Sequence, residues 1–170
     1  MNGILAVLFT IIGPTVMWTN YCDTGCFQRS TADGGWAVNV NRTIFQGDFI
    51  GSELYVRYDL GHKFGPFQPT FGASITDTQD VWIGNGANLE WTFGKRDQAF
   101  VELSLMPGFY FQGNGVDLGG VLEARSGIAV GYEFQNGGKL AVSFDHRSNA
   151  DIYATNPGLE TLGLRYTLRF

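Results

Sequence analysis

The amino-acid sequence predicts an all-β protein, an eight-stranded antiparallel transmembrane β-barrel with a polar, charged lumen. Three observations support this fold class. Apolar and polar residues alternate with period two along most of the chain, turn residues separate the alternating segments, and charged residues gather on one face of the predicted strands. A chain of 170 residues is long enough for one such barrel.

The composition narrows the alternatives. Charged residues make up 16% of the chain, against about a quarter in soluble domains. The mean hydropathy of −0.03 argues against a bundle of membrane-spanning helices, and the longest apolar run, residues 3–13, is shorter than the ~20 residues that a spanning helix needs. The net charge of −5 argues against a nucleic-acid partner, because phosphate binding requires a basic surface.

The first part of the chain precedes the alternating pattern. Residues 1–20 carry no charged side chain and resemble the apolar region of a secretory signal, although no basic residue precedes them and no clean cleavage site follows. We expect a signal-like segment over 1–20, with a short ordered N-terminal piece as the alternative. An N-terminal extension over 21–35 holds Cys22 and Cys26. No histidine lies nearby to complete a zinc site, so export would favour a local disulfide.

The barrel is predicted over residues 36–170. In each segment aliphatic and aromatic residues alternate with polar residues or glycine, and the glycines on the polar face leave room for charged side chains. Short turns at 63–66, 94–97 and 136–138 contrast with longer connections at 112–120 and 149–159, a difference typical of the two rims of an outer-membrane barrel. The predicted strands, in order, cover residues 36–45, 54–60, 67–76, 87–93, 101–111, 122–134, 140–148 and 160–170.

The charged face decides between a membrane barrel and a soluble one. A soluble, lipocalin-like barrel would turn its apolar face inward and its charged face to water, where lysine is common. Here lysine is almost absent from the strands, and the charged set is nearly neutral, which suits mutual pairing inside a narrow lumen. The residues concerned are Arg57, Asp59, Glu90, Glu102, Glu123, Arg125, Glu133, Asp145, Arg147, Arg165 and Arg169.

The last strand carries a second indication of an outer-membrane protein. Residues 161–168 follow the order polar, x, Gly, x, x, aromatic, x, apolar, and Phe170 is aromatic. This order resembles the insertion signal of bacterial outer-membrane proteins. It implies recognition by the barrel assembly machinery through the C-terminal strand.

Three polar residues interrupt the apolar outer face. Period two places His146 and Ser148 on that face of one strand, and Glu160 on that face of the next. The ten residues from Phe170 back to Glu160 match the ~9–11 that cross a bilayer, so the three residues lie at the outer-leaflet interface. Such groups are costly against lipid, and a hydroxyl, an imidazole and a carboxylate can form a nucleophilic triad. The alternative is that they lie in a wet interfacial loop without contact.

Two further polar residues, His62 and Arg42, lie outside this set of three. His62 lies beside Gly61 and Lys63 with no acidic or nucleophilic companion, which favours a structural role. Arg42 falls on the outward face of the first strand, where it indicates either a bulge or a position at the rim of the barrel. Neither residue is assigned to catalysis.

The residues around the three polar positions resemble a known family. His146-Arg147-Ser148-Asn149-Ala150 and the run from Asn156 to Glu160 are similar to the lipid A 3-O-deacylases of the PagL type. That family is an eight-stranded outer-membrane barrel with a His-x-Ser-Asn motif and a glutamate twelve residues after the serine. Both spacings occur in this sequence.

The resemblance implies a serine-type carboxylic ester hydrolase that removes the 3-O-linked hydroxyacyl chain from lipid A of lipopolysaccharide. The site would lie at the outer leaflet of the Gram-negative outer membrane, with outer-membrane lipid around it and no cofactor or metal. An acyl-enzyme and direct attack by water both stay open, as does the oligomeric state. The alternative function is a non-enzymatic small barrel, structural or adhesive.

By position, Ser148 would be the nucleophile, His146 the base, Glu160 its partner and Asn149 part of the oxyanion hole, while Asn156, Pro157 and Gly158 would shape the loop.

Overall fold

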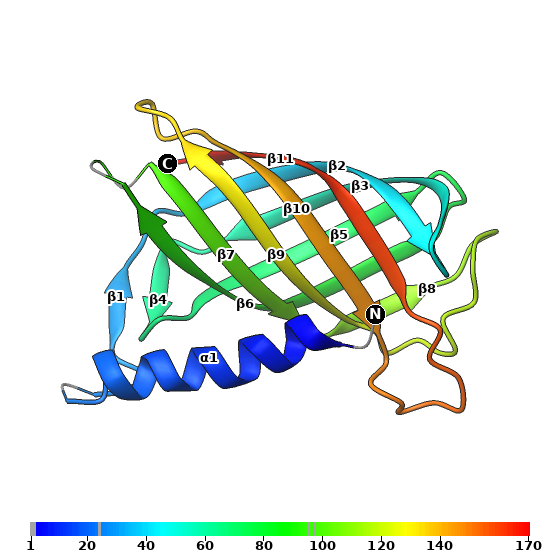
Figure 1. Ribbon diagram of the computed structural model, residues 1–170, viewed down its shortest axis with the longest axis horizontal. Helices are drawn as coiled ribbons and strands as arrows, with labels where there is room; N and C mark the ends of the chain where they lie inside the picture. Colours follow the sequence, from blue (N-terminus) through cyan, green and yellow to red (C-terminus); the bar gives the residue numbers. More distant parts are fainter. Residues whose placement is uncertain (1–2, 24, 95, 97) are drawn as a thin grey trace.

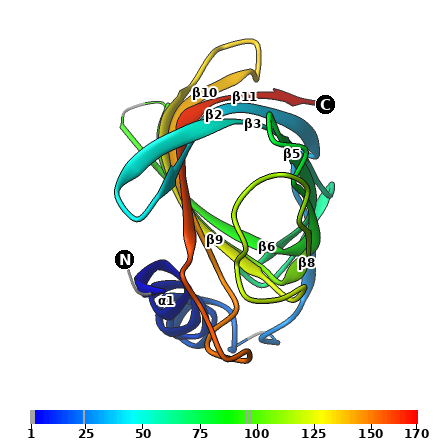
Figure 2. The same cartoon turned by 90° about the vertical axis from the view of Figure 1, so that its right-hand side faces the viewer.

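The computed structural model describes residues 3–23, 25–94, 96 and 98–170. One helix, α1 (Ile4–Asn20), is followed by strands that close into an antiparallel barrel (Figure 1). Figure 2 looks at one end of the barrel and shows α1 outside the wall. The predicted fold class is confirmed.

The barrel has eight strands in the described part of the chain. The sheet runs in the order β5-β3-β2-β11-β10-β9-β7-β6-β8, and pairing of β5 with β6 closes it. β7 and β8 form one barrel strand interrupted at Pro107, which has no N–H for the ladder. The strands are β2 (Gly35–Phe45), β3 (Asp48–Asp59), β5 (Gln68–Thr76), β6 (Val81–Phe93), β7 (Ala99–Met106), β8 (Gly108–Phe111), β9 (Ala124–Glu133), β10 (Lys139–Ser148) and β11 (Leu159–Arg169).

The two rims differ as predicted. Residues 112–123 and 149–158 form the long connections at one rim, which we call the outer rim. The opposite rim carries the connection between β6 and β7, the turn 134–138 and a small two-stranded sheet of β1 (Arg29–Thr31) with β4 (His62–Phe64). His62 therefore pairs with Thr31 far from the outer rim, in a structural position.

The strands turn their apolar side chains outward. In β2, Val38 and Val40 are 43% and 67% exposed, whereas the intervening Asn39 is 1% exposed. An apolar outer face and a polar interior are what a barrel in lipid requires.

Ion pairs fill the lumen. Glu102 accepts hydrogen bonds from both Arg57 and Arg165 at 2.7 Å, and Arg125 contacts Glu53 and Asp145 at 3.0 Å each. The predicted pairing of charged groups inside a narrow barrel is confirmed. Further pairs join Lys139 to Glu90, Arg147 to Glu53 and Arg169 to Glu90.

An apolar cluster occupies the outer end of the lumen. Tyr55 and Trp82 lie there against a row of glycines on adjacent strands, where Gly72 pairs with Gly84 and Gly84 with Gly108. A Cβ on Gly72 would come within 2.5 Å of the Tyr55 hydroxyl, and one on Gly84 within 2.5 Å of the Trp82 ring. The expectation that lumen glycines make room for charges is therefore wrong at this row, where they make room for aromatic rings.

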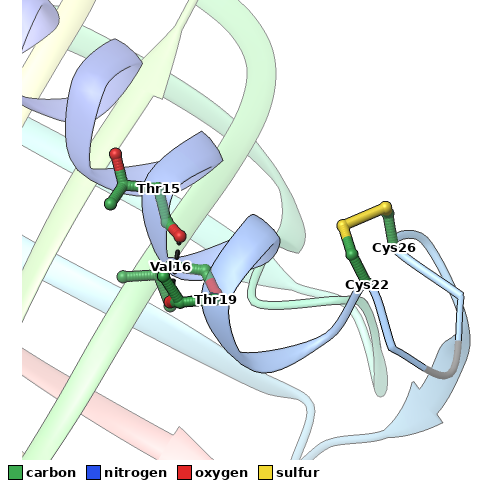
Figure 3. Close-up of a disulfide and its surroundings, with 5 residues drawn as sticks. All are labelled: Thr15, Val16, Thr19, Cys22 and Cys26. Carbon is green, nitrogen blue, oxygen red and sulfur yellow. Dashed lines mark hydrogen bonds between the residues drawn. A yellow bond between two sulfur atoms is a disulfide. The ribbon is translucent and has the colours of Figure 1, made fainter.

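Helix α1 lies on the outer wall of the barrel. Its Phe9 packs with Leu89 of β6 and Leu103 of β7, while Ile11 is 60% exposed on the helix's other side. A disulfide joins Cys22 to Cys26 just after the helix (Figure 3). In the described part of the chain, no helix is long and apolar enough to span a membrane. The signal-like role of residues 1–20 stays a prediction.

Candidate active site

His146 and Glu160 face each other across two strands. They are direct partners in the antiparallel pairing of β10 with β11, and both lie on the outward side of the barrel. Directly opposite residues bring their Cβ atoms to roughly 5 Å, within reach of a hydrogen bond between the side chains. The His146 Nδ1 lies 3.2 Å from Glu160 Oε1, so the carboxylate can fix the orientation of the imidazole.

The His146 imidazole is covered although its strand position faces outward. The side chain is 6% exposed, because the outer loop 149–158 returns over it before β11 begins. Gly158 makes this close approach possible. It has a φ of +72°, which favours glycine, and a Cβ there would stand 2.8 Å from His146 Cε1. The backbone at Gly158 therefore packs directly on the imidazole.

Ser148 occupies the next outward position along β10, where the strand ends. Its side chain is half-buried, and its hydroxyl makes no hydrogen bond to any described residue. The structure thus brings Ser148 and His146 to one face of one strand without joining them by a hydrogen bond. Catalytic hydrogen bonds are often absent in ligand-free geometry and form when substrate binds.

Ser148 lines an apolar pocket of about 600 Å³ on the outside of the barrel wall. The pocket crosses β5, β6 and β8 and reaches the start of β9. Loop residues after Ser148, namely Asn149, Ala150 and Ile152, also line it. Its apolar lining includes Phe71, Ile83, Phe109, Leu122 and Ile152.

Asn149 links the two long outer loops. Its carboxamide is 1% exposed, and Nδ2 donates to the carbonyl oxygens of Leu118 and Thr155 at 2.9 Å each and to Glu123 Oε1 at 3.2 Å. Its backbone N–H donates to Asn156 Oδ1 at 3.1 Å. These donors are engaged within the ligand-free protein, and the oxyanion-hole role of Asn149 stays a prediction.

The residues predicted to shape the loop lie where the loop is held together. Asn156 accepts from the Asn149 backbone and donates through Nδ2 to Asp151 Oδ1 at 3.0 Å. Pro157 separates Asn156 from Gly158, which lies against His146. The three residues thus span the return of the loop to the site.

Two residues of this site were not predicted from the sequence. Ser126 of β9 is the direct partner of His146 on the other side of β10, is 2% exposed, and donates from Oγ to the His146 carbonyl oxygen at 3.3 Å. It could have been found, because it is a polar residue among the outward apolar residues of its strand. The second is Glu123, which the sequence places among the charged residues of the lumen. In the structure it also lines the pocket beside Ser148.

Arg42 lies outward on β2, at the outer rim. The pairing of β2 with β3 shifts register between Thr43 and Ile44, one residue beyond Arg42, and the extra residue is Ile50 of β3, so Arg42 itself keeps its regular partner Ser52. Its guanidinium contacts Ser52 Oγ at 3.5 Å and lies 6.0 Å from the centre of the Phe49 ring. Among the described residues, no group of three His, Cys, Asp or Glu side chains is arranged to hold a metal ion.

Fold and site together define a class of protein. A closed barrel with an apolar outer face, an ion-paired lumen and a histidine–carboxylate pair on its outer wall is a small membrane-spanning β-barrel with a polar site turned toward lipid. The model of the family described as lipid A 3-O-deacylase (PagL) matches residues 50–169, and the chain belongs to this family. It is a protein of the Gram-negative outer membrane, as predicted.

Solved structures show the same fold. The crystal structure of the outer-membrane enzyme PagL superposes with a TM-score of 0.65 and 18% identity, covering 80% of this chain and 99% of that one. The Neisserial surface protein A has a TM-score of 0.54 and 11% identity, over 84% and 99% of the two chains. A designed transmembrane β-barrel has a TM-score of 0.52 and 9% identity, over 84% and 99%. No curated protein matches the chain.

Proposed function

We propose that this protein removes the 3-O-linked hydroxyacyl chain from lipid A, with Ser148 as nucleophile, His146 as general base and Glu160 as the residue that orients His146. The family supplies the reaction class. The observation that carries the assignment is the direct pairing of His146 with Glu160 on the outer wall, with Ser148 at the next outward position. A site on this wall meets a lipid substrate within the membrane, without passage through the ion-paired lumen.

The geometry suggests a sequence of proton transfers. Glu160 accepts a hydrogen bond from Nδ1–H of His146, which leaves Nε2 as the basic nitrogen. Nε2 takes the proton of Ser148 Oγ as that oxygen attacks the ester carbonyl carbon. When the tetrahedral adduct collapses, the bond to the sugar 3-oxygen breaks, and His146 returns the proton to that oxygen. The sugar leaves, and an acyl ester remains on Ser148.

Water completes the cycle. His146 takes a proton from a water molecule that attacks the acyl ester, and returns it to Ser148 Oγ as the 3-hydroxy fatty acid leaves. The apolar pocket beside Ser148 provides a surface for the acyl chain. Direct attack by water on lipid A, activated by the same His146, would give the same products. Trapping of an acylated Ser148 by rapid quench and intact-protein mass spectrometry distinguishes the two routes.

The test is to incubate the refolded protein with lipopolysaccharide in detergent and weigh the lipid A by mass spectrometry. We expect the wild type to remove one 3-hydroxyacyl chain and Ser148→Ala to leave lipid A intact. Ser143→Ala is a matched control, because Ser143 lies on the same strand but faces the lumen, where it accepts from Asn39 Nδ2 at 2.8 Å. An inactive wild type would support the non-enzymatic barrel, and an active Ser148→Ala would remove Ser148 as nucleophile.

A further inference from the structure

Glu123 is a buried carboxyl group near the proposed nucleophile, at the outer rim. It immediately precedes β9, is 1% exposed, and lines the same pocket as Ser148. Its Oε1 accepts from Asn149 Nδ2 at 3.2 Å. Its Oε2 is buried and has no hydrogen-bond partner among the described residues. A buried carboxylate oxygen without a partner is energetically costly.

No positive charge compensates Glu123 in the described part of the chain. The nearest arginines in sequence and across the strands are engaged elsewhere: Arg125 pairs with Glu53 and Asp145, and Arg147 pairs with Glu53. The indole of Trp82 donates to the backbone carbonyl of Glu123, not to its carboxyl group. The titratable group near Glu123 from β8 is Tyr110, whose hydroxyl donates to Val116 O. Asp80 and Asp117 also interact with Tyr110, and both are acidic.

There are too few hydrogen-bond donors around the Glu123 carboxyl group for the oxygens that need them. The Asn149 amide has two hydrogens, yet three oxygens accept from it: Leu118 O, Thr155 O and Glu123 Oε1. Asn149 Oδ1 is also buried and without a partner. Two buried oxygens of these hydrogen-bonded residues, Asn149 Oδ1 and Glu123 Oε2, therefore lack a hydrogen. One proton on Glu123 satisfies both, because a neutral carboxylic acid donates through its O–H and a carboxamide oxygen accepts.

We propose that Glu123 is a neutral carboxylic acid in the resting protein, and that its O–H donates to Asn149 Oδ1 and so positions the residue that follows Ser148. Glu123 acts through Asn149 and is a positioning residue. The inference rests on the proposed function for its effect on deacylation, whereas the protonation state of Glu123 can be measured without any substrate.

The protonation state of Glu123 would affect the positions of both Ser148 and His146. Asn149 follows Ser148 in the chain, and its backbone N–H holds Asn156, two residues before the Gly158 that covers His146. Burial raises the pKa of Glu123 to about 7, and the hydrogen bond from Asn149 opposes that rise. Because this pKa lies above that of an exposed glutamate, the stabilising proton is fully present in acid and is lost as the pH rises through 7.

The first experiment compares pH profiles of kcat/KM for the wild type, Glu123→Gln and Asp117→Asn. Gln keeps the shape of the acid, and its amide can donate to Asn149 Oδ1 at every pH. We expect wild-type activity to fall above pH 7, approaching tenfold per pH unit, and Glu123→Gln to lack this fall. Asp117→Asn is the control, because Asp117 is an exposed carboxyl in the same outer loop. A Glu123→Gln profile that falls like the wild type overturns the positioning role.

The second experiment measures the proton directly. Infrared spectra of the Ser148→Ala protein, taken between pH 5 and 9, should contain a protonated-carboxyl band that disappears near pH 7 and is missing when Glu123→Ala or Glu123→Gln is added. Absence of such a band at pH 6 overturns the neutral acid, even if neither Glu123 variant folds. A wild type that does not deacylate lipid A refutes the proposed function and the positioning role with it, while the infrared band still decides the state of Glu123.

Discussion

At the scale of single residues, Gly158 is the most informative position outside the proposed triad. A side chain there meets two obstacles, a φ of +72° and the His146 imidazole at 2.8 Å from the new Cβ. We predict that Gly158→Ala displaces the imidazole from Glu160 and lowers kcat/KM by about 100-fold, since a shift near 1 Å in a catalytic group can cost that much. Deacylation assays on the folded variant measure it.

A control variant, Gly137→Ala, distinguishes the effect of backbone strain from the effect of contact with His146. Gly137 has a φ of +81°, but a Cβ on it would meet nothing within 4 Å. Gly137→Ala should therefore introduce similar backbone strain in a turn at the other rim and leave deacylation unchanged. If both variants lost activity equally, the contact of Gly158 with His146 would not be the cause.

Glu160 tests the orientation of His146. In Glu160→Gln the neutral amide can place an N–H toward Nδ1, which favours the tautomer with its proton on Nε2 and removes the base that Ser148 needs. We predict a fall in kcat of about 10³–10⁴-fold, as in triads whose carboxylate is replaced by an amide. Glu133→Gln, which changes an ion-paired glutamate at the opposite rim, should keep full kcat. A fall of less than tenfold in Glu160→Gln would mean that His146 is oriented by another group.

At the scale of the strands, the sequence predicts the features that follow from the alternation of apolar and polar residues. Alternation alone indicated the eight barrel strands, although β3 begins at Asp48 instead of residue 54 and β6 at Val81 instead of residue 87. It also placed His146, Ser148 and Glu160 on one face, because a strand has only two faces. Alternation carries no information about contacts across the lumen or between loops. The rings of Tyr55 and Trp82 against the glycine row, and the link from Asn149 to Glu123, join residues far apart in sequence and could not be predicted.

The glycine row predicts a coupling between two strands. In β5, the three atoms nearest to a Cβ on Gly72 would all belong to the Tyr55 side chain of β3, with the hydroxyl at 2.5 Å. We predict that Gly72→Ala destabilises the barrel by about 1–3 kcal/mol through overpacking. The same substitution in a Tyr55→Leu background should cost less, because the ring is gone. Urea unfolding of the four proteins in detergent measures the coupling, and equal losses in both backgrounds would contradict it.

At the scale of the whole molecule, the barrel wall separates the ion pairs that stabilise the lumen from the proposed catalytic site. The ion pairs face the lumen, whereas the His146–Glu160 pair and the pocket beside Ser148 face outward. The family match covers residues 50–169, so it includes both sides of this wall. What joins the two sides is the outer rim, where Glu123 and Asn149 lie between the lumen and the proposed nucleophile.

This separation gives the last prediction. Glu102 is 4% exposed and accepts from both Arg57 and Arg165, so Glu102→Gln leaves two buried guanidinium groups with reduced compensation. We predict a loss of about 3–5 kcal/mol in unfolding free energy. We also expect unchanged kcat at temperatures where the variant is folded, because the network does not touch the outer wall. Ser148→Ala should show the reverse, lost activity with unchanged stability. If folded Glu102→Gln lost activity, the lumen would have to control the geometry of the site, and the wall would not act as a rigid boundary between the two.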